Sequence, residues 1–179
     1  TTGNMVILQQ EIACISNYFK LIEVRYDSRF SLSVEIPKEL WKCRVPHLII
    51  QPVVENAIFH GLEEKLEGGK VTIDIIVTDK NLILMISDNG KGMDVDTLKE
   101  LNARIQSNNV ELDDREERNQ RNTGIALPNI HKRIQLLFGE EYGVNVYSTA
   151  GQGTDVEITI PANYKTDREK DHEERIAEN

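Results

Sequence analysis

Hydrophobic side chains in the first 27 residues recur at alternating spacings of three and four positions. The pattern comprises Met5, Leu8, Ile12, Ile15, Phe19, Ile22 and Tyr26. Such a seam predicts a helix over about residues 5–27. Two packing arrangements fit the seam equally well. The helix lies on the core of its own domain, or it packs on a partner helix in a dimeric bundle.

Alternation of hydrophobic and polar residues predicts strands further along the chain. One strand is expected over residues 29–37, where a proline ends it. Residues 71–77 and 82–87 are rich in β-branched residues and are joined by a short polar stretch, which predicts a hairpin. Residues 144–148 and 155–160 predict a second pair of strands.

Three later segments carry helix signals. Residues 46–61 are expected to form a helix with a proline in its first turn and a glycine at its end. Pro52 must kink or split this helix, because proline removes a backbone donor. Further helices are expected over about residues 95–105 and 128–138.

Strands in adjacent pairs, with helices between the pairs, predict an α/β (α+β) two-layer sandwich. Its sheet should be mixed and mostly antiparallel, with helices on one face and a long helix before it. No G-x-G-x-x-G follows a predicted strand and no G-x-x-x-x-G-K-[ST] occurs. A Rossmann fold and a P-loop protein are therefore not expected.

Composition narrows the class further. The chain has 179 residues, 39% hydrophobic and 28% charged, which suits one globular domain. Its net charge of −9 argues against nucleic acid as a partner. The two cysteines and four scattered histidines form neither a disulfide framework nor a zinc-site pattern. With no long apolar run and no signal peptide, we expect a soluble, cytoplasmic piece of a longer protein.

Residues 107–122 contain five acidic residues and three arginines but little that is apolar. This stretch cannot bury enough surface to fold alone, and we expect it to be a lid over a functional site. The charged tail over residues 165–179 is expected to be solvated helix or disorder, and we assign it no function.

Two polar clusters are candidates for chemistry. Asn56 and His60 lie four residues apart on the predicted helix and share a face. An asparagine oxygen suits Mg²⁺ alongside phosphate oxygens, although the pair alone also fits a helix face turned to water. Asp88 follows an apolar strand and could accept the exocyclic amine of a purine. Gly90 and Gly92 would let a ligand approach the backbone, although they also fit an ordinary turn.

Two glycine-containing segments complete the set. Residues 123–127 lie between the polar stretch and a helix, where backbone amides can form an anion site. Residues 151–154 join the last two strands. Taken singly, the first also fits a flexible joint and the second a plain hairpin turn.

The ordered combination of these segments resembles the Bergerat ATP-binding fold of gyrase-type ATPases, Hsp90, MutL and histidine kinases. Residues 18–26, 46–61 and 129–134 narrow the resemblance to bacterial sensor histidine kinases of the LytS/YesM type. The resemblance covers roughly residues 8–162.

This resemblance implies a role for individual residues. Asn56 would hold Mg²⁺ on the ATP phosphates, with Glu55 beside it as a tentative catalytic group that orients water or metal. Asp88 would accept the adenine amino group, and Thr154 would assist through water. The remaining implied nucleotide contacts are His60, Gly90, Gly92, Met93, Thr123, Gly124, Ile125, Ala126, Leu127, Asn129 and Gly153.

The chain also departs from the family's pattern. Asn122 and Ala126 replace two glycines of the phosphate loop, and Phe59 stands where a lysine is frequent, which should reduce affinity for the phosphates. Pro52 occupies the position of the water-activating glutamate of gyrase-type ATPases. Transfer of the phosphoryl group is therefore favoured over hydrolysis.

The implied protein is a histidine kinase with three parts in this chain. Residues 1–27 would end a dimerisation hairpin, 28–164 would form the ATP-binding catalytic domain, and 165–179 the tail. It would transfer the γ-phosphate to an upstream histidine for relay to a response-regulator aspartate. The whole protein would be a homodimer through the N-terminal helix, anchored in the bacterial cell membrane. The alternatives are a nucleotide-responsive binding module without transfer, and a serine kinase or ATPase of the same fold.

Overall fold

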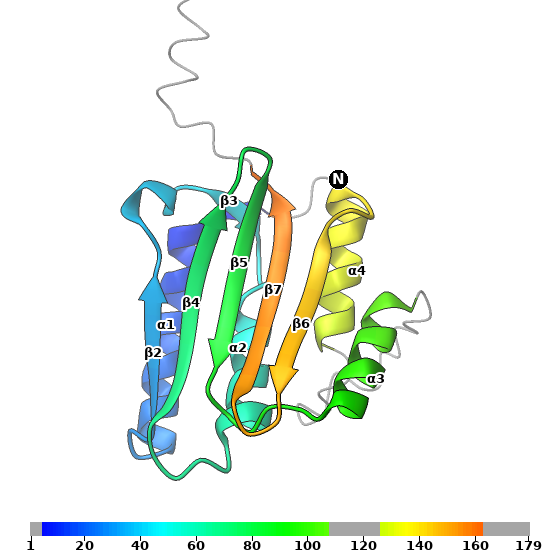
Figure 1. Cartoon of the computed structure of the whole chain (residues 1–179). Coiled ribbons are helices and arrows are strands. Elements are labelled where there is room, and N and C mark those ends of the chain that lie inside the picture. Colours follow the sequence, from blue (N-terminus) through cyan, green and yellow to red (C-terminus); the bar gives the residue numbers. More distant parts are fainter. Residues whose placement is uncertain (1–4, 108–125, 163–179) are drawn as a thin grey trace, which may run out of the picture.

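A five-stranded sheet forms the centre of the computed structural model, which describes residues 5–107 and 126–162 (Figure 1). Its strand order is β2-β4-β5-β7-β6. The strands are β2 (Phe30–Glu35), β4 (Gly69–Val77), β5 (Asn81–Asp88), β6 (Gly143–Thr149) and β7 (Gly153–Pro161). β2 pairs with β4 in parallel, and the other neighbours in this sheet are antiparallel. The predicted mixed sheet is therefore confirmed.

The helices cover one face of this sheet (Figure 1). They are α1 (Leu8–Arg25), α2 (Gln51–Asn56), η2 (Ala57–Leu62), α3 (Val95–Gln106) and α4 (Ala126–Phe138), with a 3-10 turn η1 (Lys38–Leu40). α3 packs against α4 and β6 at the far edge of the sheet. This arrangement is the predicted two-layer α/β sandwich, and it confirms the two later helices.

The hydrophobic core lies between the sheet and the helices. Its strand side consists of alternate residues of the three central strands. These are Val71, Ile73 and Ile75 on β4, Leu82, Leu84 and Ile86 on β5, and Val156, Ile158 and Ile160 on β7. Each such side chain contributes roughly 1.5–3 kcal/mol when it is fully buried. The period-two pattern that predicted both hairpins thus also identifies their inward face.

α1 buries its hydrophobic seam in the core of its own domain. The buried seam residues are Leu8, Ile12, Ile15, Phe19, Ile22 and Tyr26. This is the first of the two arrangements that the spacing allowed. Leu21 and Val24 lie on the opposite side of α1 and are 70% and 80% exposed. A partner helix on α1 would therefore have to use that outer side and not the seam.

The residues before α1 form a strand that the seam did not predict. β1 (Met5–Ile7) pairs antiparallel with β3 (Arg44–Pro46) in a small second sheet. Helix α1 consequently begins at residue 8, not at residue 5. A pairing between segments so far apart in sequence leaves no local periodicity to detect.

The helix expected over residues 46–61 begins later than predicted. Pro46 ends β3, and Leu48 adopts a left-handed backbone with φ of 57°. A left-handed residue cannot continue an α-helix, so α2 begins only at Gln51. Pro52 then occupies the first turn, where its missing N–H costs no hydrogen bond. The helix also runs through Gly61 as a π-helical segment and ends at Leu62.

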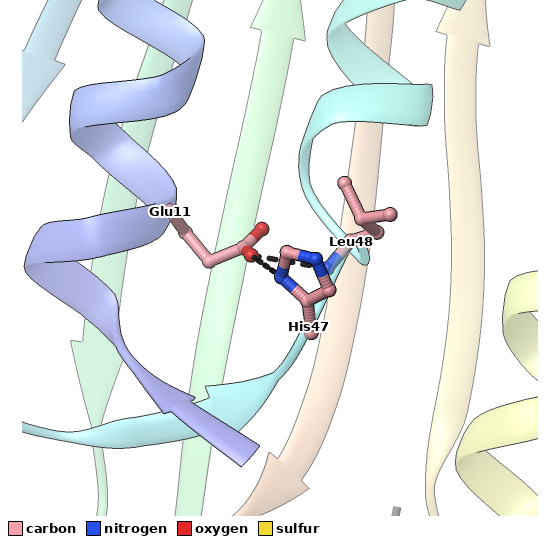
Figure 2. Close-up of polar contacts among 3 residues, drawn as sticks. All are labelled: Glu11, His47 and Leu48. Carbon is pink, nitrogen blue, oxygen red and sulfur yellow. Dashed lines mark hydrogen bonds and ion pairs between the residues drawn. The ribbon is translucent and has the colours of Figure 1, made fainter. Parts of the chain in front are cut away.

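A buried carboxylate holds the turn before α2. Glu11 of α1 is 2% exposed, and its Oε1 accepts from the backbone N–H of Leu48 at 3.0 Å (Figure 2). The same oxygen lies 2.8 Å from His47 Nδ1. The left-handed turn is thus stabilised by the first helix, which lies beside it in the fold.

Some predictions concern residues outside the described ranges. The lid expected over residues 107–122, except its first residue, and the tail over 165–179 belong to this group. Among the helices of residues 5–107 and 126–162, none is both long and apolar enough to cross a membrane.

Candidate nucleotide-binding site

A cavity of about 260 Å³ opens between α2–η2, α3, the start of α4 and the ends of β5 and β7. Its apolar lining comprises Val53, Ala57, Ile86, Met93, Leu101, Leu127 and Val156. Its polar lining includes Asn56, His60, Asp88, Lys91, Arg104 and Thr154. A mostly apolar slot with few polar groups is typical of a site for a flat organic ligand.

Asp88 is one of two carboxylates that line this cavity, with Glu100. It stands at the last position of β5, and its Oδ1 accepts from the backbone N–H of Gly90 at 2.9 Å. The pKa of Asp88 is raised to about 6, chiefly by burial and to a small extent by nearby Asp155, while backbone N–H groups of Gly90 and Thr154 oppose this rise. At pH 7 the group is therefore mostly ionised and acts as a hydrogen-bond acceptor.

Glycines bring η2 against the loop after β5. A Cβ on Gly61 would lie 2.5 Å from Asp88 Oδ1, and Gly90 packs on the Gly61 backbone. The Lys91 N–H donates to Gly61 O at 3.0 Å. Gly90 does not line the cavity, so its missing side chain serves packing between two protein segments and not the predicted approach of a ligand. Gly92 does line the cavity and has a φ of 65°.

A hydroxyl network lies behind the polar end of the cavity. Ser148 Oγ accepts from the Met93 N–H at 2.9 Å, donates to Gly153 O at 2.8 Å and lies 2.8 Å from Thr154 Oγ1. Thr154 and Met93 line the cavity, whereas Gly153 is buried against the backbone of Asp88. Gly153 was predicted as a nucleotide contact. In the structure, its missing side chain lets the start of β7 pack against the end of β5.

Asn56 and His60 both line the cavity, as their spacing predicted for a shared face. Burial lowers the pKa of His60, and the charge of Lys91 lowers it further, whereas Glu63 opposes this shift. Lys91 is exposed and contributes a cation at the mouth of the cavity.

Glu55 lies apart from the cavity, on the side of α2 that meets α1. Its Oε1 accepts from Gln51 Nε2 at 3.2 Å. The pKa of Tyr18 on α1 is raised to about 12, first by burial of Tyr18 and second by the negative charge of Glu55. The structure thus does not bring Glu55 together with the other candidate residues.

The start of α4 contributes one lining residue, Leu127. Ala126 and Asn129 belong to the same helix but do not line the cavity. Asn129 Oδ1 is buried and has no partner within the described residues. Thr123, Gly124 and Ile125 lie outside the described ranges, as does Asn122.

The α3 side of the cavity was not predicted. Thr97, Glu100, Leu101 and Arg104 line it, at spacings that place them on one face of the helix. That spacing was visible in the sequence. The position of α3 beside β6, which turns this face toward Asp88, depends on tertiary packing and was not.

Comparison with known proteins agrees with this geometry. The sequence profile of the family described as "Histidine kinase-, DNA gyrase B-, and HSP90-like ATPase" matches residues 44–164. The chain belongs to this ATPase family. Its LytS/YesM resemblance is also confirmed among curated relatives. The chain is 30% identical over 158 residues to "Sensor histidine kinase YesM" of Bacillus subtilis (strain 168), covering 88% of this chain and 24% of the relative.

A second relative of this ATPase-family chain is "Sensor protein LytS" of Staphylococcus epidermidis, 28% identical over 174 residues, 97% of this chain and 27% of that protein. The chain thus spans about a quarter of the length of these relatives. Among solved structures, histidine kinase ThkA in complex with response regulator protein TrrA has a TM-score of 0.60 at 14% identity. The match covers 89% of this chain and 42% of that one, and it shows the shared fold.

Proposed function

We propose that this chain is the catalytic, ATP-binding part of a sensor histidine kinase. The observation that carries the proposal is the half-buried carboxylate of Asp88 in a cavity whose lining surface is mostly apolar. A purine ring fits such a slot, because its faces contact hydrocarbon while its exocyclic amine donates to the carboxylate. The family and the two sensor relatives support ATP as the nucleotide.

Mg²⁺ would bind beside Asn56. Within the described residues, no group of three or more His, Cys, Asp or Glu side chains could hold a metal ion. Mg²⁺ usually takes one or two protein oxygens and completes its shell with phosphate oxygens and water, so a single asparagine fits this role. The ion would neutralise charge on the phosphates during transfer.

Transfer to a protein acceptor suits the site better than hydrolysis. Pro52 has no acid–base capacity, and Glu55 is turned toward α1. The acceptor would be a histidine upstream of this chain. Buried His131 Nδ1 accepts from the Val144 N–H, so His131 is not available as the acceptor.

The partners follow from the same proposal. A response regulator would receive the phosphoryl group, and the support is that the similar kinase ThkA was solved with a response regulator. The whole protein would be a membrane-anchored homodimer. Its dimer contact would involve the outer side of α1, where Leu21 and Val24 are exposed.

Calorimetric titration with ATP, with and without Mg²⁺, tests the proposal. Asp88→Asn should weaken ATP binding by about tenfold or more, because a hydrogen bond to a charged group contributes roughly 1.5–3 kcal/mol. Asp79→Asn, on an exposed turn, is the matched control and should bind like the wild type. Absence of ATP binding by the folded wild type, or equal binding by both variants, would contradict the proposal.

A further inference from the structure

Ser148 uses its full hydrogen-bonding capacity inside the protein. A serine hydroxyl offers one proton and two lone pairs. Gly153 O is a carbonyl oxygen and can only accept, so the Ser148 proton goes to it at 2.8 Å. The Met93 N–H can only donate, so it occupies one lone pair at 2.9 Å. A single lone pair of Ser148 Oγ then remains for the third partner, Thr154 Oγ1, at 2.8 Å.

This proton count fixes the direction of the last bond. Because Ser148 donates its only hydroxyl proton to Gly153 O, Thr154 must be the donor in the contact between the two hydroxyls. Both lone pairs of Thr154 Oγ1 then remain for other partners. Thr154 lines the cavity, whereas Ser148 stands behind it on the neighbouring strand.

We propose that Ser148 is a positioning residue that makes Thr154 an acceptor-only group toward the cavity. Asp88, Thr154 and Ser148 form one row across β5, β7 and β6, since Asp88 pairs with Thr154 and Thr154 pairs with Ser148. The polar end of the cavity therefore presents two acceptors, a carboxylate and a hydroxyl oxygen. It favours a base edge or a bridging water that donates, and it disfavours a base whose position 6 only accepts.

The inference deepens the proposed function and rests on it, since it concerns which nucleobase the site selects. The informative pair of ligands is ATP and the triphosphate of 6-methoxypurine riboside, called here the methoxy analogue. N1 is an acceptor in both bases, and position 6 carries an amine that donates in ATP but an oxygen that only accepts in the methoxy analogue. Binding of both, with Mg²⁺, is measured by calorimetry at pH 8, where Asp88 with a pKa of about 6 is ionised. The readout is the ratio of the two dissociation constants.

Ser148→Ala releases the Thr154 proton to rotate into the cavity, so a base with an acceptor at position 6 becomes better tolerated. We expect the preference for ATP to fall about three- to tenfold, chiefly through tighter binding of the methoxy analogue. Ser87→Ala is the matched control. It lies next to Asp88 on β5, but alternation turns it to the opposite face of the sheet, and its ratio should stay at the wild-type value.

Thr154→Val provides a second, independent test that leaves Ser148 in place. If Thr154 only accepts from the ligand side, loss of its oxygen should weaken ATP and spare the methoxy analogue. If Thr154 instead donated into the cavity, the methoxy analogue would weaken more than ATP, and that result would overturn the inference. An unchanged ratio in folded Ser148→Ala would overturn it as well, while strong wild-type ATP binding would leave the proposed function standing.

Discussion

At the scale of single residues, the site depends on a carboxylate, Asp88, in surroundings that disfavour its negative charge. Burial is the main reason that the pKa of Asp88 rises to about 6. The unfolded chain has an ordinary aspartate, so the buried charge opposes folding above about pH 6. This cost is relieved as the pH falls from about 6 toward 3.8. Fold stability and ligand affinity therefore respond to acid in opposite directions at this residue.

Affinity for ATP should be nearly constant between pH 7 and 8 and should fall below about pH 6. Protonation of Asp88 removes its negative charge and leaves only a neutral carbonyl oxygen to accept the purine amine, so the loss should grow below pH 6 and level off near that of Asp88→Asn. Calorimetric titrations across this range measure the effect. Asp88→Asn has no carboxyl group to titrate at this position. Its ATP affinity, although weaker, should therefore not show the fall below about pH 6 that Asp88 causes. A remaining acid dependence would then be traced with His60→Gln, since His60 also lines the cavity.

At the scale of elements, the first helix holds the start of the nucleotide-binding helix through one side chain. Glu11 accepts the N–H of Leu48, three residues before α2 begins at Gln51. A non-glycine residue in the left-handed region costs roughly 1–3 kcal/mol and persists only where its surroundings hold it. The position of Asn56 thus depends on a contact made by α1.

Glu11→Ala should destabilise the fold by about 1–3 kcal/mol, because the Leu48 N–H loses its acceptor. It should also weaken ATP binding, since α2 is less firmly placed. Urea unfolding and calorimetry measure the two effects. Glu23→Ala changes an exposed glutamate of the same helix and is expected to stay within about 0.5 kcal/mol of the wild type. Equal behaviour of the two variants would show that the Glu11 contact contributes nothing.

At the scale of the whole molecule, the folding unit is larger than the family match. That match begins at residue 44, yet α1 and β2 lie before it and share the core with the rest. β2 pairs with β4 along its full length, and Phe19 of α1 and Phe30 of β2 are 2% exposed. Removing both elements would expose the hydrophobic face that they cover.

A fragment of residues 44–164 should therefore fail to fold cooperatively, whereas the full chain should show one sharp unfolding transition. Two-dimensional NMR spectra and thermal unfolding of both forms measure this difference. Phe19→Ala in the full chain gives a milder version of the same loss, about 3–5 kcal/mol. Leu21→Ala, two residues away on the exposed side, is the control for it. A well-dispersed spectrum from the short fragment would contradict the expectation.

Local patterns predicted most of this architecture, and distant pairings account for what they missed. Alternation was enough for both hairpins, because each strand buries one face. The left-handed turn at Leu48 depends on Glu11, some 37 positions earlier, so no local signal marks it. The same holds for Gly90, whose partner is Gly61 on another element. Asp88 was found because its motif is contiguous, whereas Arg104 faces the cavity only through the placement of α3.

The small sheet of β1 and β3 has a mechanical consequence. Met5 pairs with Pro46, Val6 with Val45 and Ile7 with Arg44. Tension on the chain before Met5 is therefore applied first to the pair that contains Pro46, next to His47 and its contact with Glu11. Further in, the N–H groups of Leu8 and Gln9 donate to Cys43 O and Trp41 O, so the pairing would open from Met5 toward these bonds. The pairing of β1 with β3 thus fastens the start of the chain to the turn before α2. Opening this pairing would loosen the turn while leaving the large sheet intact.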